Sequence, residues 1–317
     1  MSGDPLSYVS EEDFEKIYKR IKYRVVEGIH PSEKPFAVIL GGQPGAGKSN
    51  IYDYYERNIT NNFVRINCDD YREYHPNFKE IYEKYGDADS DYTQDFVSRV
   101  NKRLVSELSK EKYNMIVEST LHSTRVPLAI CGQLKKLNYS VELCVMGTYK
   151  AISWQSTIVR KEEMKKNGIQ PRGVTKEYHD YVCKNICNSL SIVYQSKKMD
   201  NILVLSREKS RILYDARITP DLNPEQILSA RLYNPPEKAS KIIDRIMQQY
   251  RKAKGRSEEL KKSMAAAFNQ VLKTSVKKLR ADTVALDDLT KPHQRTFNPR
   301  EGRNARDQAT DSEIKRI

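Results

Sequence analysis

Residues 42–49 read Gly-Gln-Pro-Gly-Ala-Gly-Lys-Ser and directly follow an apolar run at residues 36–40. Glycines let successive backbone N–H groups turn toward a phosphate, where a larger side chain would block the approach. Lys48 can reach the outer phosphates of a nucleoside triphosphate, and the Ser49 hydroxyl can bind Mg²⁺. A helix beginning at residue 50 would point its positive end at the same phosphates. We therefore expect ATP or GTP, with Mg²⁺, at this loop, which comprises Gly42, Gln43, Pro44, Gly45, Ala46, Gly47, Lys48 and Ser49.

Two further segments that we predict to be strands have acidic residues at or just after their carboxyl ends. Asp69 and Asp70 follow the run at residues 63–67, and Glu118 ends the run at 114–118. A carboxylate in the first position could accept a proton from a substrate hydroxyl, although either aspartate could instead cap the helical residues that follow. Glu118 could bind Mg²⁺ directly or through water, or could be a surface acid at a strand end.

Two arginines flank a basic stretch at residues 160–168. A mobile segment of this composition could close over a nucleotide, where the guanidinium groups of Arg160 and Arg172 would stabilise charge on the transferred phosphate. Such stretches are also common on solvated helix faces, so composition leaves both readings open.

Regular alternation of strands and helices must position these groups. Apolar runs predict strands at 36–41, 63–67, 114–118, 141–146 and 202–206, and helical patterns predict helices at 10–28, 92–109, 125–137 and 151–166. This order is typical of an α/β fold with a mostly parallel sheet flanked by helices, which binds ligands at the carboxyl ends of its strands.

Composition narrows the class of protein further. The five cysteines are scattered and mostly lie in apolar runs, which indicates free thiols in a reducing compartment and hence a cytoplasmic protein. Cys183 and Cys187 are four residues apart, but no partner ligands lie nearby, so we expect them to pack rather than bind metal. The sequence shows neither a signal pattern nor an apolar stretch long enough to span a membrane.

The pattern changes at residues 233–236, Tyr-Asn-Pro-Pro, which predicts a boundary between a domain at 1–234 and a helical extension at 235–280. Residues 281–317 are polar and are expected to be a disordered tail. From residue 251 to the end there are 17 Lys and Arg but 9 Asp and Glu, out of a net charge of +13. This basic region could bind nucleic acid, anionic lipid or an acidic protein, or could simply be a solvated helical face.

Taken together, these segments resemble the zeta toxin family, the kinases of bacterial toxin–antitoxin systems. The resemblance covers about residues 10–234. It rests on the loop at 42–49, on Ile66-Asn67-Cys68-Asp69 followed by His75-Pro76, on Tyr113 to Thr120 with Val126-Pro127, on Ser153 to Arg160, and on Arg172 to Asp180.

Membership would imply a P-loop kinase fold and transfer of phosphate from ATP, with Mg²⁺, to a sugar hydroxyl of UDP-N-acetylglucosamine. By this resemblance Asp69, six residues before His75, is the base; Lys48 and Ser49 hold phosphates and Mg²⁺. Glu118 and Thr120 match the acid and hydroxyl after the third strand, and Arg160 and Arg172 match two phosphate-clamping arginines. It also implies a small helical antitoxin that covers the nucleotide site.

Two positions depart from the family pattern. Where the family has Gly-Thr-x-Arg after the strand acid, this chain reads Ser119-Thr120-Leu121-His122. Sixteen residues before Glu118, where the family has a glutamate for the sugar, the chain has Lys102, or Asn101 if the alignment shifts by one. The nucleotide half of the site therefore matches better than the acceptor half. Two alternatives stay open: a P-loop kinase of another small metabolite or nucleoside, and a catalytically altered nucleotide-binding regulator with a nucleic-acid-binding tail.

Overall fold

The computed structural model of the chain describes residues 4–170, 173–207 and 211–253. Arg172, residues 254–280 of the expected helical extension and the expected disordered tail at 281–317 lie outside the described residues.

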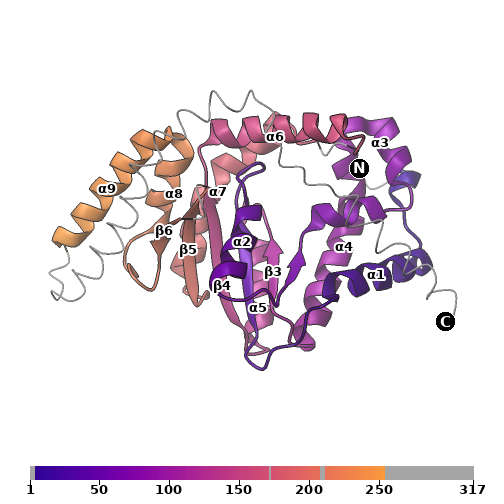
Figure 1. Cartoon of the computed structure of the whole chain (residues 1–317), viewed down its shortest axis with the longest axis horizontal. Coiled ribbons are helices and arrows are strands. Elements are labelled where there is room, and N and C mark those ends of the chain that lie inside the picture. Colours follow the sequence, from indigo (N-terminus) through magenta and orange to yellow (C-terminus); the bar gives the residue numbers. More distant parts are fainter. Residues whose placement is uncertain (1–3, 171–172, 208–210, 254–317) are drawn as a thin grey trace. The chain divides into compact units, whose positions relative to one another are not determined.

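A six-stranded sheet forms the centre of the fold (Figure 1). Its strands are β1 (Phe36–Gly41), β2 (Val64–Ile66), β3 (Met115–Glu118), β4 (Ser140–Gly147), β5 (Asn201–Ser206) and β6 (Ile212–Asp215), in the spatial order β2-β3-β1-β4-β5-β6. The first five strands are parallel and β6 is antiparallel to β5. The predicted mostly parallel sheet is confirmed. The sequence analysis did not predict β6, which is an edge strand whose first two residues are only partly buried.

Helices cover both faces of this sheet. They are α1 (Glu11–Val26), α2 (Ser49–Asn58), α3 (Phe78–Tyr85), α4 (Asp89–Lys110), α5 (Arg125–Lys135), α6 (Lys150–Lys166), α7 (Lys176–Ser196), α8 (Pro224–Tyr233) and α9 (Pro236–Ala253). Side chains alternate across a strand, so Ala37 and Ile39 of β1 pack into a core shared with α1, α4 and α7. Val38 and Leu40 pack into a second core on the other face with α2. Both faces of the sheet are therefore buried, as a parallel sheet requires.

The His-Pro element is a structural tie in this fold. His75 is 3% exposed, and its Nε2 lies 3.4 Å from the carbonyl oxygen of Ser7. Its Nδ1 accepts a hydrogen bond from the backbone N–H of Asn77, and its ring packs edge-on against Phe96 of α4. The histidine thus joins the N-terminal turn to the segment that follows β2, and the carboxylate of Asp69 lies in that segment.

The boundary predicted at residues 233–236 falls between α8 and α9. Ala239 and Ile243 of α9 are nevertheless 0% and 4% exposed, and Ile243 belongs to the larger core. The first part of the expected helical extension therefore packs with the preceding residues.

All five cysteines are free, and burial raises the pKa of every one of their thiols. Cys183 and Cys187 lie on the buried side of α7, in the larger core.

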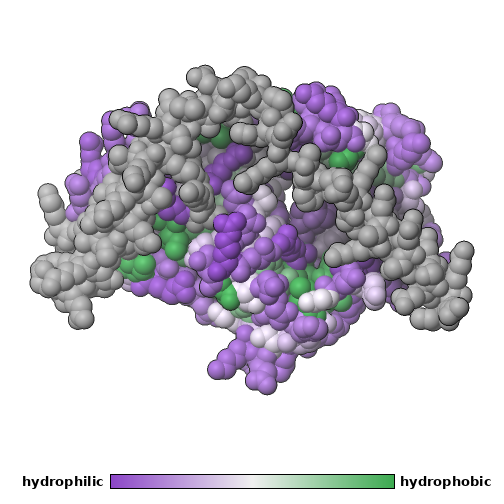
Figure 2. Space-filling model, in the orientation of Figure 1, coloured by the Kyte–Doolittle hydropathy of each residue, from purple (hydrophilic) through white to green (hydrophobic). Residues whose placement is uncertain are grey.

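On the face shown in Figure 2, hydrophilic residues cover most of the described surface. No helix within the described ranges is both long and apolar enough to cross a membrane.

Candidate active site

The loop at 42–49 joins β1 to α2 in the form its glycines predict. Gly45 and Gly47 have φ angles of +74° and +88°, which are strained for other residues. A Cβ atom on Gly45 would lie 2.0 Å from the carbonyl oxygen of Ser153, so the backbone of α6 packs directly on the loop. The loop therefore has a conformation and a packing environment that any residue larger than glycine at position 45 would disrupt.

Lys48 and Glu118 meet at the ends of two neighbouring strands. The Nζ atom of Lys48 donates to the carbonyl oxygen of Gly42 at 3.2 Å and lies 4.0 Å from Oε2 of Glu118. Glu118 also accepts a 2.6 Å hydrogen bond from the phenol of Tyr52 on α2. Burial, followed by the charge of Glu118, raises the pKa of Tyr52, so this phenol stays a donor. Glu118 is therefore held in place beside the loop and is not a free surface acid.

The buried side chain of Gln43 supports the loop through hydrogen bonds. Its side chain is 0% exposed, and its Nε2 donates to the carbonyl oxygen of Thr148 at 2.8 Å and to Ser153 Oγ at 3.2 Å. The hydroxyl of Thr148 donates in return to the carbonyl oxygen of Ala46 at 2.7 Å. The amide nitrogen of the Gln43 side chain is thus bonded within the protein, where it supports the conformation of the loop.

Asp69 is exposed at the end of β2 and is oriented by an arginine. Its Oδ1 accepts from Nε of Arg72 at 3.0 Å, and Arg72 in turn donates to Thr93 Oγ1 of α4 at 2.7 Å. Asn67, rather than either aspartate, caps the short helix that follows. Asp70 also lies near the site, because its charge contributes to the raised pKa of Tyr52. Neither aspartate has the capping role that was the alternative to catalysis.

The turn after β3 carries the residues that depart from the family pattern. Leu121 has a φ angle of +56° and is fully buried. On either side of it, Thr120 Oγ1 lies 2.7 Å from His122 Nδ1. Burial lowers the pKa of His122, so its ring is neutral at pH 7. Two exposed tyrosines of α7, Tyr178 and Tyr181, lie with ring centroids 6.3 and 5.7 Å from the His122 ring.

Arg160 lies on α6, one turn beyond the residues that touch the loop. Ser153 and Thr157 face Gly45, and helical spacing puts Arg160 on the same side of α6 as these two. Its side chain is exposed and makes no hydrogen bond or ion pair with any described residue. Arg160 is thus available to a ligand bound at the loop.

Lys102 and Asn101 have different environments on α4. The side chain of Lys102 is exposed, whereas Oδ1 of Asn101 is buried and lacks a hydrogen-bond partner among the described residues. The alignment shifted by one residue therefore places Asn101, whose side-chain oxygen is buried, at the position of the family's glutamate.

Several residues that contact the loop or its neighbours belong to no sequence motif. Arg207, directly after β5, donates from Nη1 to the carbonyl oxygen of Gly45 at 3.3 Å and to Ser156 Oγ at 2.6 Å. Tyr52 and Thr148 are likewise single positions that a pattern search does not select. The rule that ligands lie at the carboxyl ends of strands could have indicated Thr148 and Arg207, since both directly follow strands.

These residues suit a magnesium–triphosphate complex. No group of three or more His, Cys, Asp or Glu side chains within the described ranges is placed to hold a metal ion unaided. Ser49, at the first turn of α2, and the oriented carboxylate of Glu118 are the available oxygen donors beside the loop. Because Mg²⁺ in such sites keeps water and takes phosphate oxygens as ligands, two protein donors are sufficient.

Comparison with known proteins gives one consistent result. Residues 22–219 match the model of the zeta toxin family. The chain is 31% identical over 209 residues to toxin PezT of Streptococcus pneumoniae serotype 4, covering 66% of this chain and 82% of that protein. It is 29% identical over 224 residues to toxin zeta of Streptococcus agalactiae, covering 70% and 78%.

A solved structure supports the fold. It comes from a study of the PezAT chromosomal toxin–antitoxin system of Streptococcus pneumoniae. It matches with a TM-score of 0.66 and 23% identity, over 78% of this chain and all of that one. At this identity the likeness establishes the architecture of the P-loop kinase fold.

Proposed function

The chain belongs to the zeta toxin family, and from this premise we propose that it is a kinase that transfers the γ-phosphate of ATP to a hydroxyl group. The observation that carries the proposal is the meeting of Lys48 and Glu118, 4.0 Å apart beside the glycine loop. A protein that only binds a nucleotide needs the loop. Mg²⁺-dependent phosphoryl transfer requires, in addition, an oriented acid beside the loop lysine.

The loop would bind the phosphates through its backbone N–H groups and through Lys48. Ser49, and Glu118 through water, would hold Mg²⁺, which when bound neutralises the charge of the phosphates. Tyr52 keeps the carboxylate of Glu118 in one orientation by its 2.6 Å hydrogen bond. Holding these groups in place before the substrate arrives lowers the cost of reorganisation during the reaction.

Asp69 would accept the proton of the attacking hydroxyl. Its hydrogen bond from Arg72, which is itself bonded to α4, fixes the direction of the carboxylate. Arg160, exposed on the α6 face that packs on the loop, and Arg172 would stabilise the charge on the transferred phosphate.

UDP-N-acetylglucosamine or a related nucleotide sugar is the first acceptor that we propose, on the strength of the family. Another small metabolite or a nucleoside, without a diphosphate, is the second, and one observation favours it. Where the family has a permanently charged arginine, this chain has a neutral His122 beside two exposed tyrosines. An uncharged aromatic surface contacts a sugar or base ring better than it binds a diphosphate.

We further propose that the protein is the cytoplasmic toxin of a toxin–antitoxin pair. PezT, its relative, is a toxin, and the structural match comes from a toxin–antitoxin system. The expected partner is a small helical antitoxin that covers the nucleotide site. The remaining alternative is a regulator that binds nucleic acid through its basic C-terminal region, which would show steeply salt-dependent binding and no phosphoryl transfer.

Incubation of the purified protein with ATP, Mg²⁺ and UDP-N-acetylglucosamine, followed by mass spectrometry, tests the proposal. A new product heavier by one phosphate, absent with Lys48→Ala, supports it. A bacterial metabolite extract in place of the sugar nucleotide identifies a different acceptor. If the protein forms no phosphorylated product in either mixture, the kinase proposal is wrong.

A further inference from the structure

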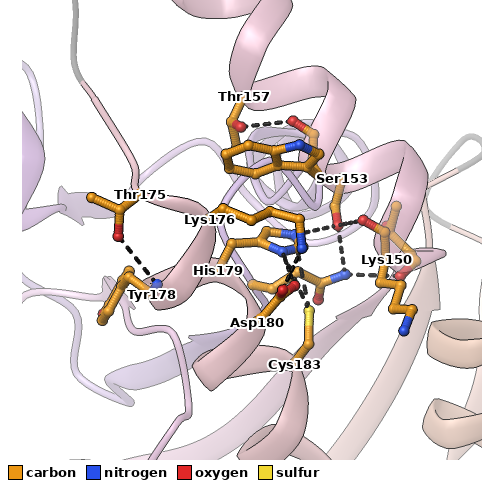
Figure 3. Close-up of polar contacts among 12 residues, drawn as sticks. Lys150, Ser153, Thr157, Thr175, Lys176, Tyr178, His179, Asp180 and Cys183 are labelled. Atoms are coloured by element: carbon orange, nitrogen blue, oxygen red, sulfur yellow. Dashed lines mark hydrogen bonds and ion pairs between the residues drawn. The ribbon is translucent and has the colours of Figure 1, made fainter. Parts of the chain in front are cut away.

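A chain of buried hydrogen bonds leads from the glycine loop to the first turn of α7. Gln43 Nε2 donates to Ser153 Oγ at 3.2 Å, and Ser153 Oγ lies 2.9 Å from Nε2 of His179 (Figure 3). The side chains of Gln43 and Ser153 are 0% exposed and that of His179 is 1% exposed. These three residues come from the loop, α6 and α7, so one connected chain joins three elements of the candidate site.

Ser153 Oγ is the atom that links the other two side chains of this chain of bonds. The Ser153 hydroxyl has one proton, which it donates to the carbonyl oxygen of Lys150 at 3.0 Å. Its oxygen accepts from Gln43 and lies 2.9 Å from Nε2 of His179. Burial lowers the pKa of His179, so the ring is neutral and carries one proton. The Sγ atom of Cys183 packs against this ring, 3.8 Å from Nδ1 and 3.9 Å from Nε2.

Serine, histidine and an adjacent aspartate could suggest a hydrolase triad, because Asp180 Oδ1 lies 3.3 Å from His179 Nδ1. Ser153 cannot act as a nucleophile, however, since it is fully buried and its proton points at a backbone carbonyl. The arrangement is suited to holding elements together.

This chain of hydrogen bonds holds the face of α6 that packs on the loop. The carbonyl of Ser153 and the methyl of Thr157 lie against Gly45, and Ser156 accepts from Arg207. Arg160 follows one turn later on this face. Any rotation of α6 about its axis would break the bond from Ser153 to His179 and redirect the Arg160 side chain.

We propose that His179 is a positioning residue that acts through Ser153 to fix α6, and with it Arg160, relative to the phosphate-binding loop. Trp154, with its ring centroid 5.5 Å from that of His179, packs against the same imidazole and limits its movement. The role assigned to Arg160 rests on the proposed kinase function, whereas the coupling of α7 to the loop stands on contacts alone.

Three variants of the full chain test this. His179→Phe keeps a ring of similar size and removes the hydrogen bond, and His179→Gln restores a donor at a similar position. Cys187→Ala, one turn beyond Cys183, removes a buried side chain of α7 outside the chain of bonds. We expect His179→Phe to lower kcat by about tenfold or more while the Kd for ATP changes by less than about threefold. His179→Gln should recover part of the loss, and Cys187→Ala should match the wild type.

Hydrogen exchange of the same variants gives a readout that needs no acceptor. His179→Phe should speed exchange in peptides covering residues 41–48 and 150–157, whereas Cys187→Ala should speed it within α7 alone. Equal exchange of both peptides in wild type and His179→Phe, or an unchanged kcat in the folded variant, overturns the positioning role. If the wild-type protein transfers phosphate to nothing, the kinase proposal fails and the exchange data still decide the coupling.

Discussion

The phenol of Tyr52 donates a 2.6 Å hydrogen bond to Oε1 of Glu118, linking the helix after the glycine loop to the end of a neighbouring strand. Glu118 also lies 4.0 Å from the amine of Lys48, so its carboxylate is oriented from two sides. Tyr52→Phe should therefore lower kcat by about ten- to a hundredfold and raise the Mg²⁺ concentration needed for half-maximal rate, as loss of one hydrogen bond to a charge implies.

A matched control for this change lies on the same helix. Tyr55 donates to Oε2 of Glu142 at 2.9 Å, within the same core but away from the loop lysine. Tyr55→Phe should remove a comparable hydrogen bond and leave the Mg²⁺ dependence unchanged. Equal Mg²⁺ dependence in both variants would contradict the role given to Tyr52.

The two aspartates after β2 can be separated by substitution. Asp69→Asn should reduce phosphoryl transfer by about a hundredfold or more, because a carboxamide cannot accept the hydroxyl proton. Asp70→Asn, a neutralisation at the next position, should reduce it by less than about fivefold. Initial rates at saturating ATP measure both, and the reverse order would assign the base to Asp70.

Gly45 and Gly28 have nearly the same backbone conformation and different surroundings. Their φ angles are +74° and +72°, but a Cβ on Gly28 would meet nothing within 4 Å, whereas one on Gly45 would meet the Ser153 carbonyl at 2.0 Å. Gly28→Ala should lower the free energy of unfolding by about 1 kcal/mol through backbone strain alone. Gly45→Ala should cost more and abolish ATP binding, measured by denaturant unfolding and calorimetric titration; ATP affinity like that of Gly28→Ala would show that the loop tolerates displacement.

Stability should fall in mild acid. Burial lowers the pKa of His75, His122 and His179, so below about pH 6.5 the unfolded chain binds protons that the folded protein does not. The free energy of unfolding should then decrease as pH falls, by up to about 1.4 kcal/mol per pH unit for each proton. Urea unfolding at pH 7.5 and 5.5 measures this, and His122→Gln should reduce the difference. A stability that is constant or rises toward pH 5.5 would contradict it.

The His122 position offers a test of acceptor chemistry. His122→Arg restores the charge that the family pattern has, and should raise kcat/KM for UDP-N-acetylglucosamine if its diphosphate lies near this turn. His122→Gln, which is neutral, should not. Loss of activity with the arginine and retention with glutamine would instead indicate an acceptor without charge at this point.

The sequence predicted the parallel sheet, the loop and the strand-end acid because each depends on local residue types. The helix predicted from residue 10 is α1, which Ser10 caps with its hydroxyl, accepting from the N–H of Asp13. The bonds of Gln43 to Thr148 and of Arg207 to Gly45 could not be assigned, because each joins positions more than 100 residues apart in the chain. The contact of His179 with Ser153 spans 26 residues and joins two different helices, whose packing the sequence pattern does not give. We chose Lys102 by its distance along the sequence from Glu118, which does not indicate which side of a helix faces the protein interior. The buried Oδ1 of Asn101 shows that the preceding residue is the one that faces inward. The roles of Arg160 and Arg172 stay predictions.

The five free cysteines, four of them buried, have a practical consequence. Their thiols all have raised pKa values, about 11 for Cys68 and Cys183 and about 12 for Cys187, so few of them are thiolates near neutral pH. A cysteine introduced on the surface, for example in place of exposed Lys166 on α6, should react with a maleimide dye far faster than the native thiols. Fluorescent labelling could therefore follow α6 during nucleotide binding in the otherwise unaltered protein.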